Sequence, residues 1–388
     1  MPRTNRLLVL CARTRPGSAA SDEIGRLLDL GPDWDALLAR GEEEGVLPLL
    51  FWNLGTRIVG VPEDVRDTLK VRYLRNLARN AQAAVRLRPL LEAVRDSGSR
   101  VLLTKGLRLA LTVYPDPGLR PFWDVDFIVR PADWPAVRKI LDGQGFEEAA
   151  AVPLGPGFPD TRPNGLYSPY FRLRELILEF HFNLLGLAFP LDVEACFAAA
   201  RPIQVRGVEV PVLPPELEFC YLCLHAQQHS FRRLIWLTDI AEMASRGSLD
   251  WDGVYAFCEA HKVRTSVYLA LKLAEALWPG CVGRDVLRRL RPGALARLAL
   301  GFFWPESGVA ARTASLPWPY DMPSLFSLWE RRSPGLALRT LRTVLFPPRD
   351  WLARTGGVSD SSVVVYYRYF RRLARPVGLA VRRIWKAR

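Results

Sequence analysis

The sequence predicts an α+β fold in which a small mixed sheet is flanked by helical regions before and after it in the chain. Apolar residues recur at three- and four-residue spacing through residues 22–95, short apolar runs bounded by turn residues fill residues 96–213, and helical spacing returns from residue 214. These observations divide the 388 residues into a helical N-terminal region over 1–95, a sheet-bearing core over 96–213, a helical domain over 214–330 and a tail over 331–388.

The tail carries nearly all of the net charge. It holds 14 Lys and Arg against Asp350 and Asp360, a net of +12 out of +13 for the whole chain. An electrostatic partner, either an anionic membrane surface or RNA, is therefore expected at the tail rather than at the body. The segment Val377–Arg388 has the basic amphipathic pattern of a helix lying on such a surface, although docking of its apolar side on the protein's own helices predicts the same pattern.

The remaining composition favours a cytoplasmic protein, membrane-peripheral only through its tail. The apolar run Leu7–Ala12 is too short for a secretory signal, and no apolar stretch approaches the roughly eighteen residues of a membrane-spanning helix. The six cysteines are scattered, so we expect free thiols and no disulfide framework. The bias toward Arg, Ala and Leu is typical of a GC-rich bacterial genome.

The core opens with a strand, a turn and a helix. The apolar run Val101–Leu103 stops at Thr104–Gly106, and Leu107–Tyr114 has helical spacing that ends at prolines. The elements expected after it are a strand over Phe122–Val129, a helix over Trp134–Leu141, a proline-rich loop over 151–169, a strand over Glu175–Phe182 and a hairpin over Ile203–Val212.

Two aspartates in the second strand are the strongest chemical signal. Asp124 and Asp126 are two residues apart, so both side chains leave the same face, with Cα atoms about 6 to 7 Å apart. Burying this pair without cations costs several kcal/mol, whereas divalent ions would neutralise it and could act on a nucleotide phosphorus. The alternative is a half-exposed strand with two solvated aspartates.

Three neighbouring features favour the metal-site interpretation. Lys105 and Gly106 lie at a strand-to-helix turn, where backbone N–H groups favour a phosphate. Arg120 lies four residues before Asp124, where its planar guanidinium can reach a phosphate. Glu179 and His181 share one face of the third strand, so Glu179 can complete a three-carboxylate metal set and His181 can contact a phosphate or orient a ligand.

These residues resemble the uncharacterised nucleotidyltransferase family within the DNA polymerase beta superfamily. The resemblance covers about residues 95–245. It is carried by Leu103–Leu107, Tyr114–Pro121, Asp124–Val129, Gly145–Phe146, Glu179–His181 and His225–Asp239. Two positions depart from the superfamily pattern: Lys105-Gly106 stands where Gly-Ser or Gly-Gly is usual, and Glu179 stands where Asp is usual.

The resemblance implies a sheet of the nucleotidyltransferase type and a Mg²⁺ (or Mn²⁺) site formed by Asp124, Asp126 and Glu179. It also implies transfer of a nucleoside monophosphate from an NTP with release of pyrophosphate. Lys105, Gly106, Arg120 and His181 would contact the nucleotide. The acceptor is open among a small molecule, a protein and RNA. The alternative is a noncatalytic nucleotide- or RNA-binding protein on the same fold, which the Lys105-Gly106 turn keeps in consideration.

A continuous helix over residues 220–240 would carry a polar and aromatic stripe. At 100° per residue the stripe gathers five side chains that could line the active-site cleft or pack on the sheet: His225, His229, Arg232, Trp236 and Asp239. Cys220 and Cys223 precede the two histidines, but Cys223 and His225 would point about 160° apart on such a helix, which argues against zinc.

Overall fold

The computed structural model describes residues 2–55, 60–149, 169–182, 192–229, 231–303 and 367. Apart from Tyr367, the predicted basic tail lies outside these residues, as does nearly all of the predicted loop over 151–169. In the described part of the chain, no helix is long and apolar enough to cross a membrane.

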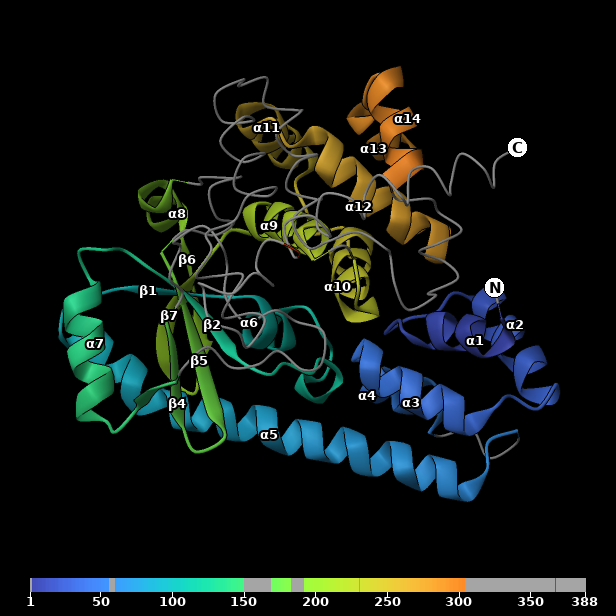
Figure 1. The fold of residues 1–388 in the computed structure, drawn as a ribbon, viewed down its shortest axis with the longest axis horizontal. Helices are drawn as coiled ribbons and strands as arrows, with labels where there is room; N and C mark the ends of the chain where they lie inside the picture. Colours follow the sequence, from blue (N-terminus) through green and yellow to red (C-terminus); the bar gives the residue numbers. More distant parts are fainter. Residues whose placement is uncertain are drawn as a thin grey trace.

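A mixed sheet of seven strands, in the order β3-β4-β5-β2-β1-β7-β6, forms one end of the molecule (Figure 1). The strands are β1 Val101–Thr104, β2 Val125–Val129, β3 Glu147–Ala149, β4 Tyr170–Leu173, β5 Leu176–His181, β6 Arg201–Val205 and β7 Val208–Val212. At its centre β2 runs antiparallel to β1 and parallel to β5, while β1 runs parallel to β7. The predicted mixed sheet is thus confirmed, and it is larger than predicted because β3 and β4 join its edge.

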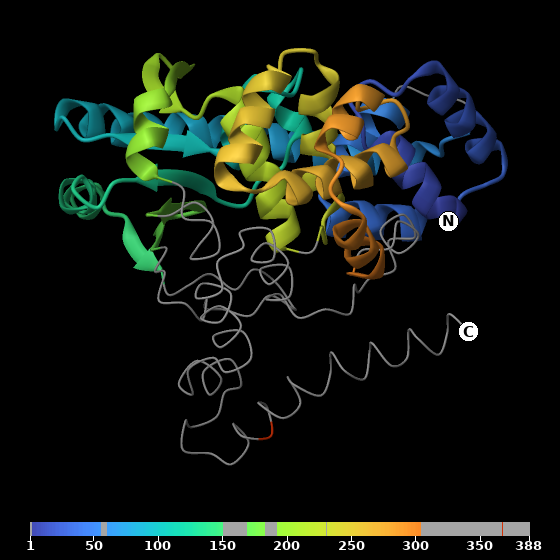
Figure 2. The same ribbon diagram turned by 90° about the horizontal axis from the view of Figure 1, so that it is seen from above.

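The described residues also form fourteen α-helices and a short 3-10 helix, η1. Those before and within the core are α1 Arg3–Cys11, α2 Ser18–Asp29, α3 Trp34–Glu44, α4 Leu47–Leu54, α5 Glu63–Asp96, α6 Lys105–Thr112, η1 Pro117–Leu119, α7 Trp134–Gly143 and α8 Val193–Ala199. The later helices are α9 Pro215–Gln228, α10 Leu234–Ser245, α11 Trp251–His261, α12 Arg264–Leu277, α13 Arg284–Leu290 and α14 Ala294–Phe303. Helix α5 runs along the molecule from the N-terminal helices to the sheet, and helices after residue 214 lie between these ends (Figures 1 and 2).

The two faces of the sheet belong to different cores. Phe127 and Phe180 stack at 5.5 Å between ring centroids on the face that packs against α5 and α7. Ile128, one residue along, belongs to the other core, which contains the side chains of α9 and α10. Because side chains alternate along a strand, Asp126 and Glu179 are directed to the α9 side. The side of the sheet on which Asp126 and Glu179 lie therefore follows from the alternation of apolar residues along β2 and β5.

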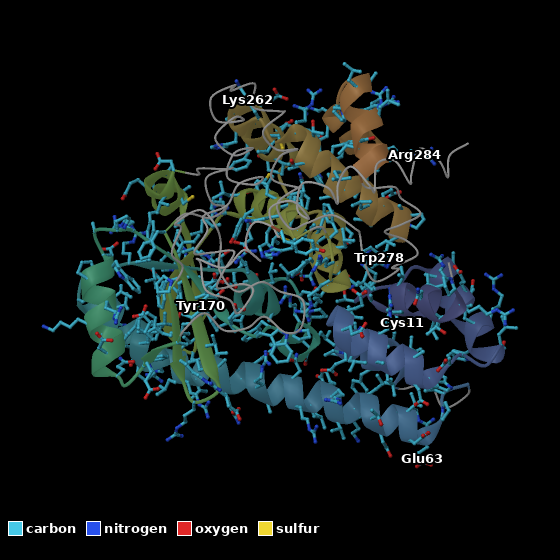
Figure 3. The ribbon with its side chains drawn as sticks, viewed as in Figure 1. Cys11, Glu63, Tyr170, Lys262, Trp278 and Arg284 are labelled. Atoms are coloured by element: carbon cyan, nitrogen blue, oxygen red, sulfur yellow. The ribbon has the colours of Figure 1, made fainter. Side chains whose placement is uncertain are left out.

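The N-terminal helices pack on the helices that follow residue 214. The indole Nε1 of Trp278 donates to the carbonyl oxygen of Val9 at 2.7 Å, where α1 meets the end of α12 (Figure 3). Arg13 adds a buried ion pair with Glu242 at 2.7 Å. Both ends of the described chain thus share one hydrophobic core, which holds α9 and α10 in place beside the sheet.

All six cysteines are free and buried, as the sequence predicts. Burial raises the pKa of Cys220 and Cys223, so both remain thiols at neutral pH. Neither belongs to the one potential metal-binding group found among the described residues. That these two cysteines form no zinc site stays a prediction from helix geometry.

Candidate functional site

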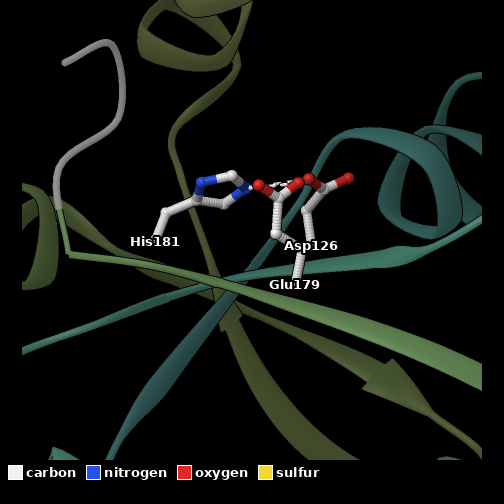
Figure 4. Close-up of side chains that lie close together, drawn as sticks. All are labelled: Asp126, Glu179 and His181. Carbon is white, nitrogen blue, oxygen red and sulfur yellow. Dashed lines mark hydrogen bonds and ion pairs between the residues drawn. The ribbon is translucent and has the colours of Figure 1, made fainter. Parts of the chain in front are cut away.

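Parallel pairing of β2 with β5 brings the predicted acidic residues together. Asp126 is the register partner of Glu179, and His181 lies two residues further along β5. The alternation predicted for this strand is confirmed, because Leu176, Leu178 and Phe180 pack in the opposite core. Asp126, Glu179 and His181 point toward one another, and each offers a ligand atom within 4.8 Å of the others (Figure 4). The two carboxylates are oxygen donors of the kind that Mg²⁺ and Mn²⁺ accept, whereas the imidazole is a donor more typical of transition metals such as Zn²⁺ or Fe²⁺.

The face of the sheet that carries Asp126, Glu179 and His181 is buried and not exposed to solvent. The exposed fractions of Asp126, Glu179 and His181 are 4%, 3% and 2%. Asp124 differs from the expectation: β2 begins at Val125, so Asp124 precedes the strand and is half-buried. Carboxylates withdrawn from water need cations or hydrogen-bond donors. For Asp126 the solvated-strand alternative is therefore excluded.

The Lys105 ammonium group is the positive charge in direct contact with Asp126. Its Nζ lies 2.6 Å from Asp126 Oδ1 and 3.2 Å from His181 Nε2. Its backbone has φ of 51°, the left-handed region, which costs a non-glycine residue about 1–3 kcal/mol. The turn thus holds the ammonium group against the carboxylates in a conformation that the chain would not adopt by itself.

The pKa values show that one cation does not neutralise the cluster. Burial opposes ionisation of Asp126, but the Lys105 ammonium and a hydrogen bond from His181 outweigh it and hold the pKa of Asp126 below its usual range. Burial, followed by repulsion from Asp126 and Glu179, raises the pKa of Asp124 to about 7. Burial also lowers the pKa of His181, which keeps the imidazole neutral and able to act as a ligand. The arrangement can therefore accept further positive charge.

The turn that was expected to bind phosphate is occupied by a glutamate that the sequence did not single out. The backbone N–H of Lys105 donates to Glu218 Oε1 at 2.9 Å, and Thr104 Oγ1 lies 3.0 Å from both carboxylate oxygens. Glu218, near the start of α9, is fully buried. This contact connects the turn to α9 and leaves the Lys105 side chain to face the carboxylates.

Gly106 is required at the turn because its backbone lies against Phe122. A Cβ at Gly106 would lie 2.5 Å from Phe122 Cβ. We expect Gly106→Ala to lower the free energy of unfolding by about 1–3 kcal/mol, measured by urea denaturation. Gly25→Ala in α2 is the control, because a Cβ there meets nothing within 4 Å and is expected to change stability by at most about 1 kcal/mol in the favourable direction. Equal effects of both substitutions would contradict close packing at the turn.

Arg120 lies in the interior, where it pairs with Asp239. Its Nη2 and Nε donate to the two carboxylate oxygens at 2.6 and 3.1 Å, and the Tyr114 hydroxyl donates to the same carboxylate at 2.6 Å. Despite burial, the Asp239 charge raises the pKa of Arg120. Arg120 was expected at the nucleotide, and Asp239 was expected either to line the cleft or to pack on the sheet. The structure places the two side chains in a buried pair that joins the approach to β2 to α10.

Two other arginines, Arg79 and Arg233, interact electrostatically with Asp124. Burial lowers the pKa of Arg79 on α5, with Asp124 opposing the shift. The same holds for Arg233, whose pKa is lowered by burial and by Arg120, while Glu44 and Asp124 oppose it. Sequence reasoning missed both, because isolated arginines are ordinary surface features. They add positive charge at the half-buried end of the carboxylate cluster.

The predicted continuous helix over residues 220–240 is wrong. Helix α9 ends at Gln228 and α10 begins at Leu234. His225, His229 and Trp236 nevertheless lie together, with ring centroids 4.6 to 5.3 Å apart. Arg232 lies in the turn between the helices and is half-buried, as are these three rings. Of the predicted stripe, only Asp239 is directed elsewhere, to Arg120.

The sequence was compared with family models, curated proteins and solved structures, and one family model matches the part of the chain that contains Asp126 and Glu179. No curated protein and no solved structure matches the chain. The model of the uncharacterised nucleotidyltransferase family matches residues 31–279, which is more than half of the chain and includes the sheet, the carboxylates and helices α9 to α12. The chain therefore belongs to the uncharacterised nucleotidyltransferase family.

Proposed function

We propose that this protein transfers a nucleoside monophosphate from an NTP to an acceptor, with Mg²⁺ or Mn²⁺ held by Asp124, Asp126 and Glu179. The observation that carries the proposal is the buried convergence of Asp126, Glu179 and His181 within 4.8 Å. Membership of a nucleotidyltransferase family supports the reaction class. We place the fold in the DNA polymerase beta superfamily on the same motif, two aspartates flanking the start of a central strand.

The residues fit a divalent ion. Asp126 and Glu179 offer buried carboxylates, and burial, followed by repulsion from these two carboxylates, raises the pKa of Asp124 to about 7. A bound Mg²⁺ or Mn²⁺ would polarise the α-phosphoryl group and activate the acceptor. Lys105 Nζ, 2.6 Å from Asp126, lies where it can exchange that contact for a triphosphate oxygen. Glu179 Oε2, 3.4 Å from His181, is placed to accept the acceptor's proton.

A noncatalytic nucleotide- or RNA-binding protein is the second candidate. It is favoured by the Lys105 ammonium, which contacts both Asp126 and His181 and so takes the position of a cation in the cluster. In that case Lys105 replaces the metal permanently, and nucleotide binding does not need a divalent ion. The two candidates therefore differ in the metal dependence of binding.

Titration calorimetry of ATP in Mg²⁺ and in EDTA separates these functions. The enzyme proposal predicts binding at least about tenfold tighter with Mg²⁺, because the ion bridges the carboxylates and the triphosphate. Equal affinity in EDTA would favour the noncatalytic protein. If ATP fails to bind in either buffer, and the other NTPs also fail, the chain has no nucleotide site, and the enzyme and the nucleotide-binding protein are both excluded.

A further inference from the structure

Three half-buried rings beside the carboxylate cluster have no role in the chemistry described so far. The ring centroids of His225 and His229 lie 4.6 Å apart, and both lie close to Trp236, at 5.3 and 5.2 Å. The interplanar angles within the trio are 58°, 83° and 41°, so none of these rings covers another in parallel stacking. All three residues are half-buried rather than fully enclosed.

A strained turn assembles the trio. Phe231 has φ of 50°, in the left-handed region, and its N–H donates to the Ala226 carbonyl oxygen at 2.7 Å. This turn ends α9 and directs α10 back, so that Trp236 contacts the histidines from the preceding helix. A left-handed non-glycine residue is unfavourable by itself, and such residues cluster at functional sites. The turn is thus a specific feature that produces the ring cluster.

The trio is linked to the carboxylates through Tyr221, one helical turn before His225. Lys105 Nζ, which contacts Asp126, lies 5.5 Å from the centre of the Tyr221 ring. The Tyr221 and His225 rings are 6.2 Å apart. A row of rings therefore leads from the position expected for the triphosphate outward along α9. A ligand with phosphates at one end and a flat ring at the other matches this order.

We infer that His225, His229 and Trp236 form the stacking surface for the nucleobase. The inference rests on the proposed function, since it takes the triphosphate to lie at the carboxylates. Stacking on aromatic side chains tolerates every base because each base has a π-face. The surface therefore contributes affinity for the base with little selection among the four NTPs. If these rings hold the nucleobase, the acceptor is recognised by other residues.

Calorimetry with Mg²⁺-ATP and Mg²⁺-tripolyphosphate tests this in the full-length wild type and in Trp236→Leu and Trp236→Phe. Trp236→Leu should weaken ATP binding about tenfold while tripolyphosphate binding is unchanged, and Trp236→Phe should retain most ATP affinity because it keeps a ring. Trp123→Leu is the matched control, because Trp123 is 62% exposed beside Asp124 but belongs to no part of the trio. It should leave both affinities at the wild-type values.

Each other outcome overturns the stacking surface. If Trp236→Leu binds ATP as tightly as wild type, or loses both ligands equally, the rings do not hold the base. If Trp123→Leu alone weakens ATP, the base lies on the other side of the carboxylates. If wild type binds neither ligand, the proposed function fails, and the stacking surface fails with it. If wild type binds both with equal affinity, the stacking surface alone fails.

Discussion

Asp126→Asn is expected to reduce nucleotidyl transfer about a thousandfold or more. The substitution removes the charge of a carboxylate that would ligate the metal, an interaction worth several kcal/mol in the transition state, and each 1.36 kcal/mol is tenfold in rate. The measurement is incorporation of label from an α-labelled NTP into an acceptor in cell extract. Asp252→Asn is the matched control, because the Asp252 side chain is 79% exposed on α11, outside the carboxylate cluster.

The loss must be separated from unfolding, because Asp126 also pairs with Lys105. In the free protein Asp126→Asn leaves a buried ammonium with a weaker partner, so we expect stability to fall by up to about 3–5 kcal/mol in urea. The double substitution Lys105→Met with Asp126→Asn should recover most of this loss without restoring transfer. If Asp126→Asn is fully folded and transfers label at the wild-type rate, the metal site is disproved.

Asp239→Asn is expected to lower the free energy of unfolding by about 3–5 kcal/mol. It removes the charge that compensates Arg120, whose side chain is 8% exposed, and weakens the hydrogen bond from Tyr114. The measurement is urea denaturation monitored by fluorescence. Glu92→Gln is the control: Glu92 forms an ion pair with Arg88 at 2.9 Å in which the Arg88 side chain is 58% exposed, so its loss should cost less than about 1 kcal/mol.

Substituting both Arg120 and Asp239 tests whether Arg120 contacts the nucleotide. The double substitution Arg120→Met with Asp239→Leu removes both charges, and we expect it to be more stable than Asp239→Asn alone because no uncompensated arginine remains. ATP affinity should be near the wild-type value, since the guanidinium contacts Asp239 and the carbonyl oxygen of Pro121 in the free protein. If the double variant is stable but binds ATP much more weakly than wild type, Arg120 instead contacts the phosphates.

Local periodicity was sufficient to predict five strands of the sheet (β1, β2, β5, β6 and β7) and the carboxylate face of β5. The alternation in Glu175–Phe182 assigned Glu179 and His181 to one side of β5, because side-chain direction in a strand depends only on the residue count. That pattern does not reveal what covers the face. Burial of Glu179 depends on α9, which begins at Pro215, so local sequence could not distinguish an interior site from a wet surface.

Long-range contacts account for what the sequence did not predict. The partners of Arg120 and Lys105 lie 119 and 113 residues away, at Asp239 and Glu218, and an acidic residue on a helix gives no local sign of such pairing. The break between α9 and α10 was missed because its left-handed residue is Phe231 rather than glycine. The edge strand β3 has the sequence Glu-Glu-Ala, which lacks the apolar alternation of a strand.

The proposed reaction transfers the nucleoside monophosphate of the NTP and not its terminal phosphate. The most direct measurement incubates the protein with Mg²⁺ and cell extract, using each NTP labelled either at the α- or at the γ-phosphate. The carboxylate cluster of Asp126 and Glu179, in a chain of this family, predicts that α-label enters an acceptor and γ-label leaves with pyrophosphate. Label entering the acceptor only from the γ-phosphate, or entering equally with Asp126→Asn, would contradict the account.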